Sequence, residues 1–173
     1  MSLPELNLGF SRPFDRRGIT AELVRLSANE AECAALATRF AIPAVLRLEA
    51  VLDISAEGEV VSARGRIDAD IVQSCAVSGE DLPVTISEPI TLRFVRPRAY
   101  APDAEIEVGG DELDEIEYTG TGFDLGEAVA QSLGLAIDPF IEGPDAERVR
   151  AEVLSAQEPS GPFAALAALK KPS

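Results

Sequence analysis

The side chain best suited to nucleophilic or redox chemistry in this sequence is the thiol of Cys75, which ends a predicted strand beside a turn. A cysteine reacts as its thiolate, and it needs a nearby base or positive charge to lower its pKa. The chain contains no histidine, and no lysine stands near Cys75. Cys75 also shares the alternation of Ile67 and Ile71, which points it to a buried face. We therefore expect a core cysteine, and a thiol-dependent enzyme using Cys75 is the weaker alternative.

The absence of histidine narrows catalysis further, because it removes the usual general base, the Ser-His-Asp and Cys-His arrangements, and imidazole metal ligands. No glycine-rich phosphate loop is recognisable. Gly120, Thr121 and Gly122 come closest, but Leu125 stands where the third glycine of a dinucleotide motif would fall. The sequence therefore predicts a protein without catalytic residues and without a cofactor.

The negative charge of the chain is its most informative global property, since 30 acidic and 15 basic residues give a net charge of -15. A protein that neutralises phosphates needs an excess of lysine and arginine, so direct wrapping of nucleic acid is disfavoured and a basic protein is the favoured partner. The acidic excess is greatest in residues 103–117, which fit a solvated linker as well as a docking site for that partner. The carboxylates of this stretch are Asp103, Glu105, Glu107, Asp111, Glu112, Asp114, Glu115 and Glu117.

Direct contact with RNA through arginine is the alternative function. The candidate arginines are Arg12, Arg16, Arg17, Arg93, Arg96 and Arg98. Two further arginines, Arg64 and Arg66, lie on a predicted strand where Glu49 and Asp53 can meet them across the ladder, and we favour this pairing over an RNA-reading patch.

Strand signals dominate the first half of the chain. Apolar and polar residues alternate in 46–54 and again in 61–71 on the far side of Gly58, which predicts a hairpin with Leu46 at the start of its buried face. A short strand is expected at 19–26. The alternation in residues 82–94 is interrupted by Pro89, which cannot donate to a ladder, so this strand is expected to be an edge strand or bent.

Helix signals come in three places. Ser27 and Glu30 have the spacing of a capping box before an amphipathic helix that ends before Pro43. Asp124 and Glu127 have capping spacing before a second helix, which Pro139 stops. Residues 144–157 fit a polar helix.

These elements predict the α+β class, with a curved antiparallel sheet or partly open barrel of about 5–7 strands covered by two or three helices. Residues 1–158 are expected to form a single domain with an extended lead-in. A tail at 159–173 is expected to carry a short apolar helix, and its Phe163 and Leu166 dock either on the domain or on a partner. The start of the chain resembles no signal peptide and no apolar run is long enough for a membrane span, so a cytoplasmic location without membrane contact is expected.

Several segments together resemble the YceD family of large ribosomal RNA subunit accumulation proteins. They are the stretch from Asp68 through Cys75 and Ser78 to Pro83, the segment 89–97, the acidic loop, the segment from Asp124 through Leu125 and Gly126 to Pro139, and the carboxyl-terminal segment 162–170. The resemblance implies a role in biogenesis of the large ribosomal subunit, through accumulation of its long rRNA. Combined with the charge, it suggests that the partner is a basic ribosomal protein or a large-subunit assembly factor.

The resemblance also raises the question of zinc, because many members of that family carry Cys-x-x-Cys after the second strand of the hairpin. The matching positions here are Cys75 and Ser78. One thiolate, with no second cysteine nearby and no histidine, cannot build a closed tetrahedral site from Cys and His. We therefore predict that this chain holds no structural zinc and no other metal.

Overall fold

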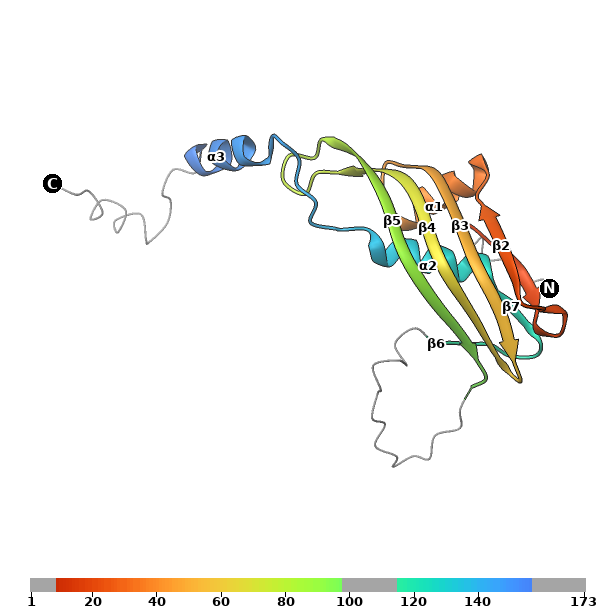
Figure 1. Cartoon of the computed structure of the whole chain (residues 1–173). Coiled ribbons are helices and arrows are strands. Elements are labelled where there is room, and N and C mark those ends of the chain that lie inside the picture. Colours follow the sequence, from red (N-terminus) through yellow and green to blue (C-terminus); the bar gives the residue numbers. More distant parts are fainter. Residues whose placement is uncertain (1–8, 98–114, 157–173) are drawn as a thin grey trace, which may run out of the picture. The chain divides into compact units, whose positions relative to one another are not determined.

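The structure is a computed structural model, and it describes residues 9–97 and 115–156 (Figure 1). Its contacts divide the chain into two compact units, of which the first consists of Met1–Gln73 and Pro83–Asp138 and the second of Ser74–Leu82 and Pro139–Ser173. The sequence prediction of one domain over residues 1–158 stays a prediction. The predicted tail at 159–173 lies outside the described residues.

The larger sheet has the strand order β2-β3-β4-β5-β6 (Figure 1). Its strands are β2 (Glu22–Ser27), β3 (Ala44–Glu57), β4 (Val60–Ser74), β5 (Asp81–Val95) and β6 (Glu115–Glu117). The pairs β2–β3 and β3–β4 are antiparallel, whereas the short β6 runs parallel to β5. The sheet is mixed and open, and the predicted α+β class is confirmed. Pro89 lies in β5 away from the residues that pair with β6, as expected for a strand edge.

The hairpin of β3 and β4 follows from alternation and from one glycine. Gly58 has a φ of 60°, which suits the tight turn between the paired residues Glu57 and Val60. One face of both strands is buried, but the prediction that Leu46 belongs to it is wrong. A register shift between Val45 and Arg47 moves Leu46 to the solvent, where it is 64% exposed, and buries Val45 in its place.

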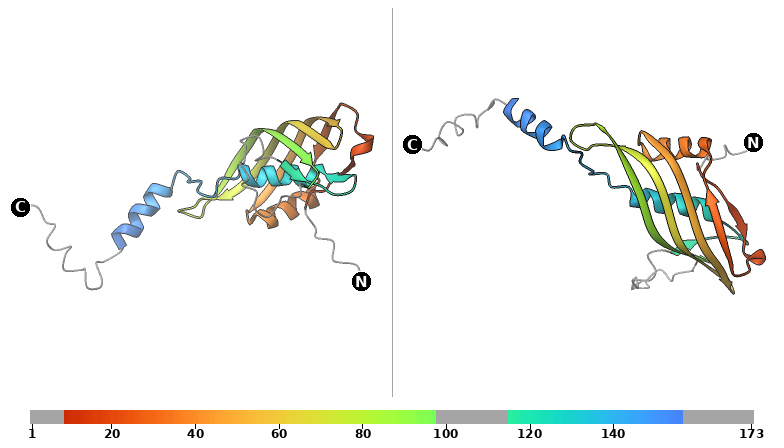
Figure 2. Two further views of the ribbon diagram at one scale, coloured as in Figure 1. Left: turned by 90° about the horizontal axis from the view of Figure 1, so that it is seen from below. Right: turned by 45° about the horizontal axis from the view of Figure 1, so that its top comes forward.

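Two helices cover one face of this sheet (Figure 2). Helix α1 (Glu30–Phe40) and helix α2 (Leu125–Ala136) contribute their apolar stripes to the core that the inward residues of β3, β4 and β5 complete. The predicted cap of the first helix is wrong by two residues. Asn29, not Ser27, is the N-cap, and it exchanges hydrogen bonds with Glu32 in a capping box.

The amino-terminal segment runs along these elements and does not stay an isolated lead-in. Strand β1 (Pro13–Asp15) pairs antiparallel with β7 (Gly122–Asp124), the strand that leads into α2, and a single 3-10 turn (Arg16–Gly18) follows β1. Phe10 is buried in the core. This pairing places residues from the two ends of the first unit next to each other.

The second unit contains the turn after β4 and helix α3 (Ala146–Ala156), which corresponds to the predicted polar helix at 144–157. Within this unit the amide of Ala76 donates to the carbonyl oxygen of Ile141, at 2.9 Å. In the ranges that the structure describes, no helix is long and apolar enough to cross a membrane.

Candidate functional site

The amino-terminal end of α2 is fixed by the carboxylate of Asp124. Its Oδ1 accepts the amide of Glu127 at 2.9 Å, which caps the helix, and the amide of Arg12 at 2.8 Å. The next residue, Leu125, is fully buried and donates its amide to the carbonyl oxygen of Arg12. One carboxylate therefore holds both the helix and the amino-terminal segment.

Gly126 completes this junction because the amino-terminal backbone crosses directly over it. A Cβ atom at this position would lie 2.7 Å from the amide nitrogen of Arg12 and 3.0 Å from the carbonyl oxygen of Phe10. Both contacts are with backbone, which cannot move aside as a side chain can. The sequence Asp124, Leu125, Gly126 is thus explained by a cap, a core residue and a close approach of two chain segments.

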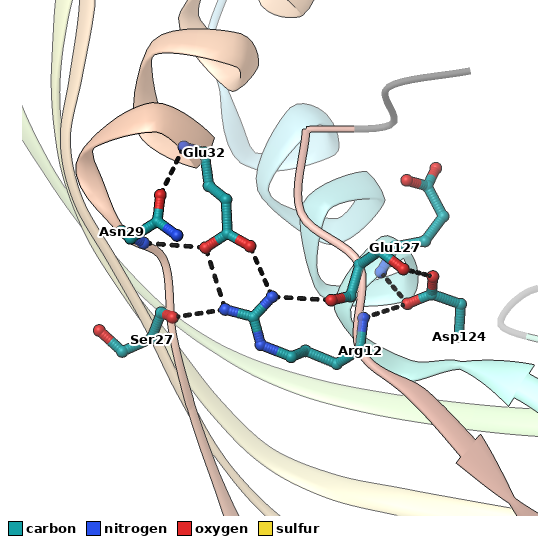
Figure 3. Close-up of polar contacts among 7 residues, drawn as sticks. Arg12, Ser27, Asn29, Glu32, Asp124 and Glu127 are labelled. Atoms are coloured by element: carbon teal, nitrogen blue, oxygen red, sulfur yellow. Dashed lines mark hydrogen bonds and ion pairs between the residues drawn. The ribbon is translucent and has the colours of Figure 1, made fainter. Parts of the chain in front are cut away.

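Arg12 connects the junction to the start of α1 (Figure 3). Its guanidinium makes two hydrogen bonds to the carboxylate of Glu32, at 2.6 and 2.9 Å, and a third to the carbonyl oxygen of Ser27. The same carboxylate accepts the amide of Asn29 in the capping box. The hydrogen bonds from Arg12 lower the pKa of Glu32, so the pair stays ionised.

A second bidentate pair joins the two helices directly. Arg39 of α1 donates to both carboxylate oxygens of Glu127 on α2, at 2.7 and 2.8 Å. Burial raises the pKa of Glu127, but the hydrogen bonds from Arg39 and Gln131 outweigh it and the pKa is lowered. Helices α1 and α2 are therefore joined by charge as well as by the core.

The arginines that the sequence offered as an RNA patch are engaged within the chain. Arg12 pairs with Glu32, Arg16 with the carbonyl oxygen of Gly58, Arg17 with Asp15, Arg93 with Glu115 and Arg96 with Glu59, while Arg98 lies outside the described residues. These pairings weaken the case for an RNA surface built from them, because each of the five described guanidinium groups already has a partner.

The predicted pairing across the β3–β4 ladder is only partly found. Arg64 lies opposite Asp53 in the register, as expected, but the structure records no ion pair between these two described residues. Arg66 donates to the hydroxyl oxygen of Ser87 instead. Glu49 binds neither of these arginines and pairs with Arg47.

A groove lies between β6 and α2 in the first unit, with a volume of about 310 Å³. Its lining includes the apolar residues Phe94, Phe123 and Ala128 and the acidic residues Glu117, Asp124 and Glu127. None of the described residues that line it is a lysine or an arginine. Glu127 pairs with Arg39, so Glu117 and Asp124 are the acidic lining residues for which no ion pair is recorded among the described residues. The groove is therefore an apolar slot with an acidic border that is partly neutralised.

Of the predicted partner-binding residues, the structure describes only Glu115 and Glu117, which form the ends of β6. Glu115 pairs with Arg93 and is largely shielded, whereas Glu117 is exposed. The remaining six carboxylates of 103–114, and Phe163 and Leu166, lie outside the described residues. The structure thus brings one predicted carboxylate, Glu117, to the groove together with Asp124.

The Cys75 turn belongs to the second unit. The Sγ of Cys75 accepts the amide of Ser78 and the amide of Gly143, each at 3.3 Å. Hydrogen bonds from Ser78 and these amides lower the pKa of the thiol to about 7, although the side chain is only 3% exposed. The expectation of a buried cysteine is confirmed. No histidine or lysine lies nearby, as the sequence indicated, but the side chain of Ser78 and the peptide N–H groups lower the pKa in their place.

A comparison with protein families matches residues 63–170, more than half of the chain, to the family described as large ribosomal RNA subunit accumulation protein YceD. The chain belongs to the YceD family. The matched range includes the Cys75 turn and the whole of α2. Searches of curated proteins and of solved structures found no match.

Zinc, which the Cys-x-x-Cys of many YceD proteins suggests, does not fit the residues at the Cys75 turn. The sulfur is occupied as an acceptor of two backbone amides, and Ser78 supplies a hydroxyl where a second thiolate would be needed. In the described part of this YceD chain, no three His, Cys, Asp or Glu side chains come together to hold a metal. The absence of zinc stays a prediction.

Sequence reasoning missed the Arg12–Glu32 and Arg39–Glu127 pairs and the groove of this YceD protein. The Asn29–Glu32 spacing is itself a capping-box signal and could have identified the start of α1. Partners that are 20 and 88 residues apart leave no local signal, since only the fold brings them together. The groove likewise depends on how β6 lies beside α2.

Proposed function

We propose that this YceD protein supports accumulation of the large-subunit rRNA without catalysing a reaction, by holding a basic ribosomal protein or assembly factor on its acidic surface in the cytoplasm. The observation that carries the proposal is the excess of negative charge that the chain leaves unneutralised. Its net charge is -15, and the arginines tested above are engaged by its own carboxylates and carbonyl oxygens. A surface of this kind attracts basic proteins and repels RNA.

The absence of catalysis is supported by the chemistry of the described residues. The groups with lowered pKa values at the α2 junction are carboxylates in ion pairs, and the thiol of Cys75 is buried with its sulfur bound by backbone amides. Each therefore has a structural role that explains its pKa. The carboxylates of the junction hold helices, and the sulfur holds a turn.

The first test of the role is deletion of the gene, followed by measurement of the ratio of large-subunit to small-subunit rRNA. We expect the ratio to fall and to be restored by the Cys75→Ser chain as fully as by the wild type. An unchanged ratio would contradict the role, and failure of Cys75→Ser would favour the thiol-dependent alternative.

The second test addresses the partner. Proteins stripped from purified large ribosomal subunits with concentrated salt are passed over the immobilised full chain, and capture is measured across a salt series. We expect capture of basic proteins that weakens steeply with salt, because it depends on exposed charge. Neutralising several carboxylates of residues 103–117 with Asn or Gln is expected to weaken capture and flatten the salt dependence.

Direct rRNA binding remains the second candidate, and a specific observation on the solvent face of the sheet supports it. Arg25 and Arg64 are exposed there, and neither makes an ion pair within the part of the chain that the structure describes. A gel-shift assay with naked large-subunit rRNA at physiological salt separates the two functions. Binding that is lost in Arg25→Ala/Arg64→Ala would favour RNA over a basic protein.

A further inference from the structure

Among the strands that the structure describes, β6 is the last of the larger sheet, and one of its sides has no neighbour there. The amide of Tyr118 donates to the carbonyl oxygen of Val95 at 2.9 Å. Because alternate residues of a strand face the same neighbour, Ile116 and Tyr118 direct their peptide groups toward β5, and Glu117 directs its N–H and C=O away from it. Among the described residues, no hydrogen bond to the peptide group of Glu117 is recorded on that open side.

The groove follows this open edge. On one side it is lined by four consecutive residues, Ile116 to Thr119, and on the other by the N-cap Asp124 and by Glu127, Ala128 and Gln131 of α2. Gln131 follows Glu127 by four positions and Ala128 by three, so these three α2 residues lie on one face of the helix. A slot between an edge strand and a helix face is the shape that accepts an extended peptide, since the peptide can add to the sheet while its side chains enter the slot.

The charge of the residues around the groove indicates which kind of peptide segment it binds. Glu117 is exposed and makes no ion pair that the structure records. None of the described lining residues is basic, and Arg96, which lies over the Tyr118 ring, is paired with Glu59. Pairing with the β6 of a second copy of this chain would place the acidic residues of the two strands next to each other, and their like charges would repel. A segment that carries lysine or arginine near apolar side chains can pair with the acidic lining residues and also contact the apolar ones.

We propose that the groove between β6 and α2 binds an extended segment of a basic protein as an added strand at the β6 edge. The peptide group of Glu117 makes the main-chain hydrogen bonds, its carboxylate receives a basic side chain, and Phe94, Phe123 and Ala128 contact an apolar one. This inference rests on the proposed function, and it specifies where and how the partner is held.

The main test replaces the outward N–H of Glu117. Glu117→Pro removes that donor while leaving the residues that face β5 unchanged, and a proline at an edge position with its missing N–H toward solvent is tolerated. Capture of the salt-stripped large-subunit proteins by the full chain is expected to fall at least tenfold. Glu117→Gln keeps the N–H and loses the charge, so a smaller loss of about threefold and a shallower salt dependence are expected.

Two further variants test whether a loss of capture is specific to the groove. Gln131→Arg places a positive charge on the exposed helix side of the groove and is expected to reduce capture at least fivefold without touching β6. Glu22→Gln removes an exposed carboxylate from β2, at the opposite end of the strand order from β6, and serves as the matched control that is expected to leave capture unchanged. Circular dichroism and the melting temperature show whether each variant is folded.

Hydrogen exchange at the Glu117 amide tests whether the β6 edge is open in the isolated chain and covered when a partner binds. In the wild type, the Glu117 amide is expected to exchange freely in the isolated chain and to become protected when the stripped proteins are added. Protection in the isolated chain would mean that another segment of the chain or a second copy fills the groove, and it would overturn the inference. Full capture by folded Glu117→Pro and Gln131→Arg would overturn the groove but leave the proposed function intact, whereas no capture by the wild type would overturn both.

Discussion

The amino-terminal end of α2 and the Cys75 turn both carry residues of the family motif, but different forces hold them. At α2, Asp124 and Gly126 are fixed by a carboxylate cap and by backbone that passes within van der Waals contact. At the turn, a single sulfur accepts two peptide N–H groups, and its charge state decides how strongly it does so. The first region is held by a helix cap and by close backbone packing, and the second by hydrogen bonds to a sulfur whose charge depends on pH.

The comparison also indicates where function is expected. Neither region presents an unengaged reactive group to solvent. The motif residues in both regions are therefore explained by their structural roles. The junction carries α2 to its place beside β6, and the groove exists only because it does. The residues that meet a partner are therefore expected at the groove and on the acidic surface, where side chains such as Glu117 remain exposed.

The largest effect is expected for Gly126→Ala, because the new Cβ meets backbone of Phe10 and Arg12 that cannot yield. We expect a loss of about 2–3 kcal/mol in the free energy of unfolding, typical of overpacking at a tight contact. Urea unfolding of the full chain measures it. Gly122→Ala is the matched control, since its Cβ has its nearest neighbour at 3.7 Å and the stability is expected to stay the same. Equal stability of Gly126→Ala and wild type would show that the junction is loosely packed.

The corresponding change at the turn, Gly143→Ala, is expected to cost less. Its Cβ overlaps the carboxylate end of Glu80 and approaches Leu82 Cδ2 to 2.7 Å, and both are ends of flexible side chains that can rotate away. The difference in free energy of unfolding between Gly126→Ala and Gly143→Ala thus compares a contact with backbone to a contact with flexible side chains.

Removal of the Arg12 guanidinium is the next largest change. Arg12→Met leaves the half-buried carboxylate of Glu32 without its bidentate partner, which is expected to lower the free energy of unfolding by about 1–2 kcal/mol. Arg17→Met is the control, because the Arg17–Asp15 pair is exposed and screened by solvent. The two midpoints of urea unfolding are compared at the same salt. If Arg17→Met lowers the free energy of unfolding as much as Arg12→Met does, the Arg12–Glu32 pair contributes no more to stability than an exposed ion pair.

The residues of the junction show what the sequence could and could not reveal. Asp124 was found as a cap because capping and helical periodicity are local, and the β3–β4 hairpin was found because alternation is local too. Leu46 was misplaced because a register shift leaves no mark in the alternation itself. The Arg12–Glu32 pair and the groove at β6 depend on segments that only the folded chain brings together, and no spacing rule predicts them.

A smaller effect, specific to pH, is expected at the turn. The pKa of Cys75 is lowered to about 7, below that of a free thiol, so its thiolate stabilises the folded state. This contribution is fully present above the pKa of the unfolded chain and is lost as the pH falls through about 7. The stability advantage of the wild type over Cys75→Ser is therefore expected to grow between pH 6.5 and 9. Urea unfolding at both pH values measures it.

The other cysteine provides the internal control. Burial raises the pKa of Cys33, which lies on α1 and for which no amide donor to the sulfur is recorded among the described residues. Ultraviolet absorbance of the thiolate is expected to show one step near pH 7 that disappears in Cys75→Ser and remains in Cys33→Ala. A step that remains in Cys75→Ser would mean that the backbone amides do not hold a thiolate.

The smallest expected effect is that of metal removal. Because the sulfur of Cys75 is engaged by two amides and Ser78 offers a hydroxyl in place of a thiolate, the turn is expected to need no zinc. Metal analysis of the purified chain is expected to find no stoichiometric zinc, and a strong chelator is expected to leave the melting temperature unchanged. Stoichiometric zinc would mean that ligands from elsewhere reach Cys75 and displace its amide donors. In that case the thiolate with a pKa near 7 would be a metal ligand, and the contrast between the two motif regions would have to be drawn from coordination chemistry.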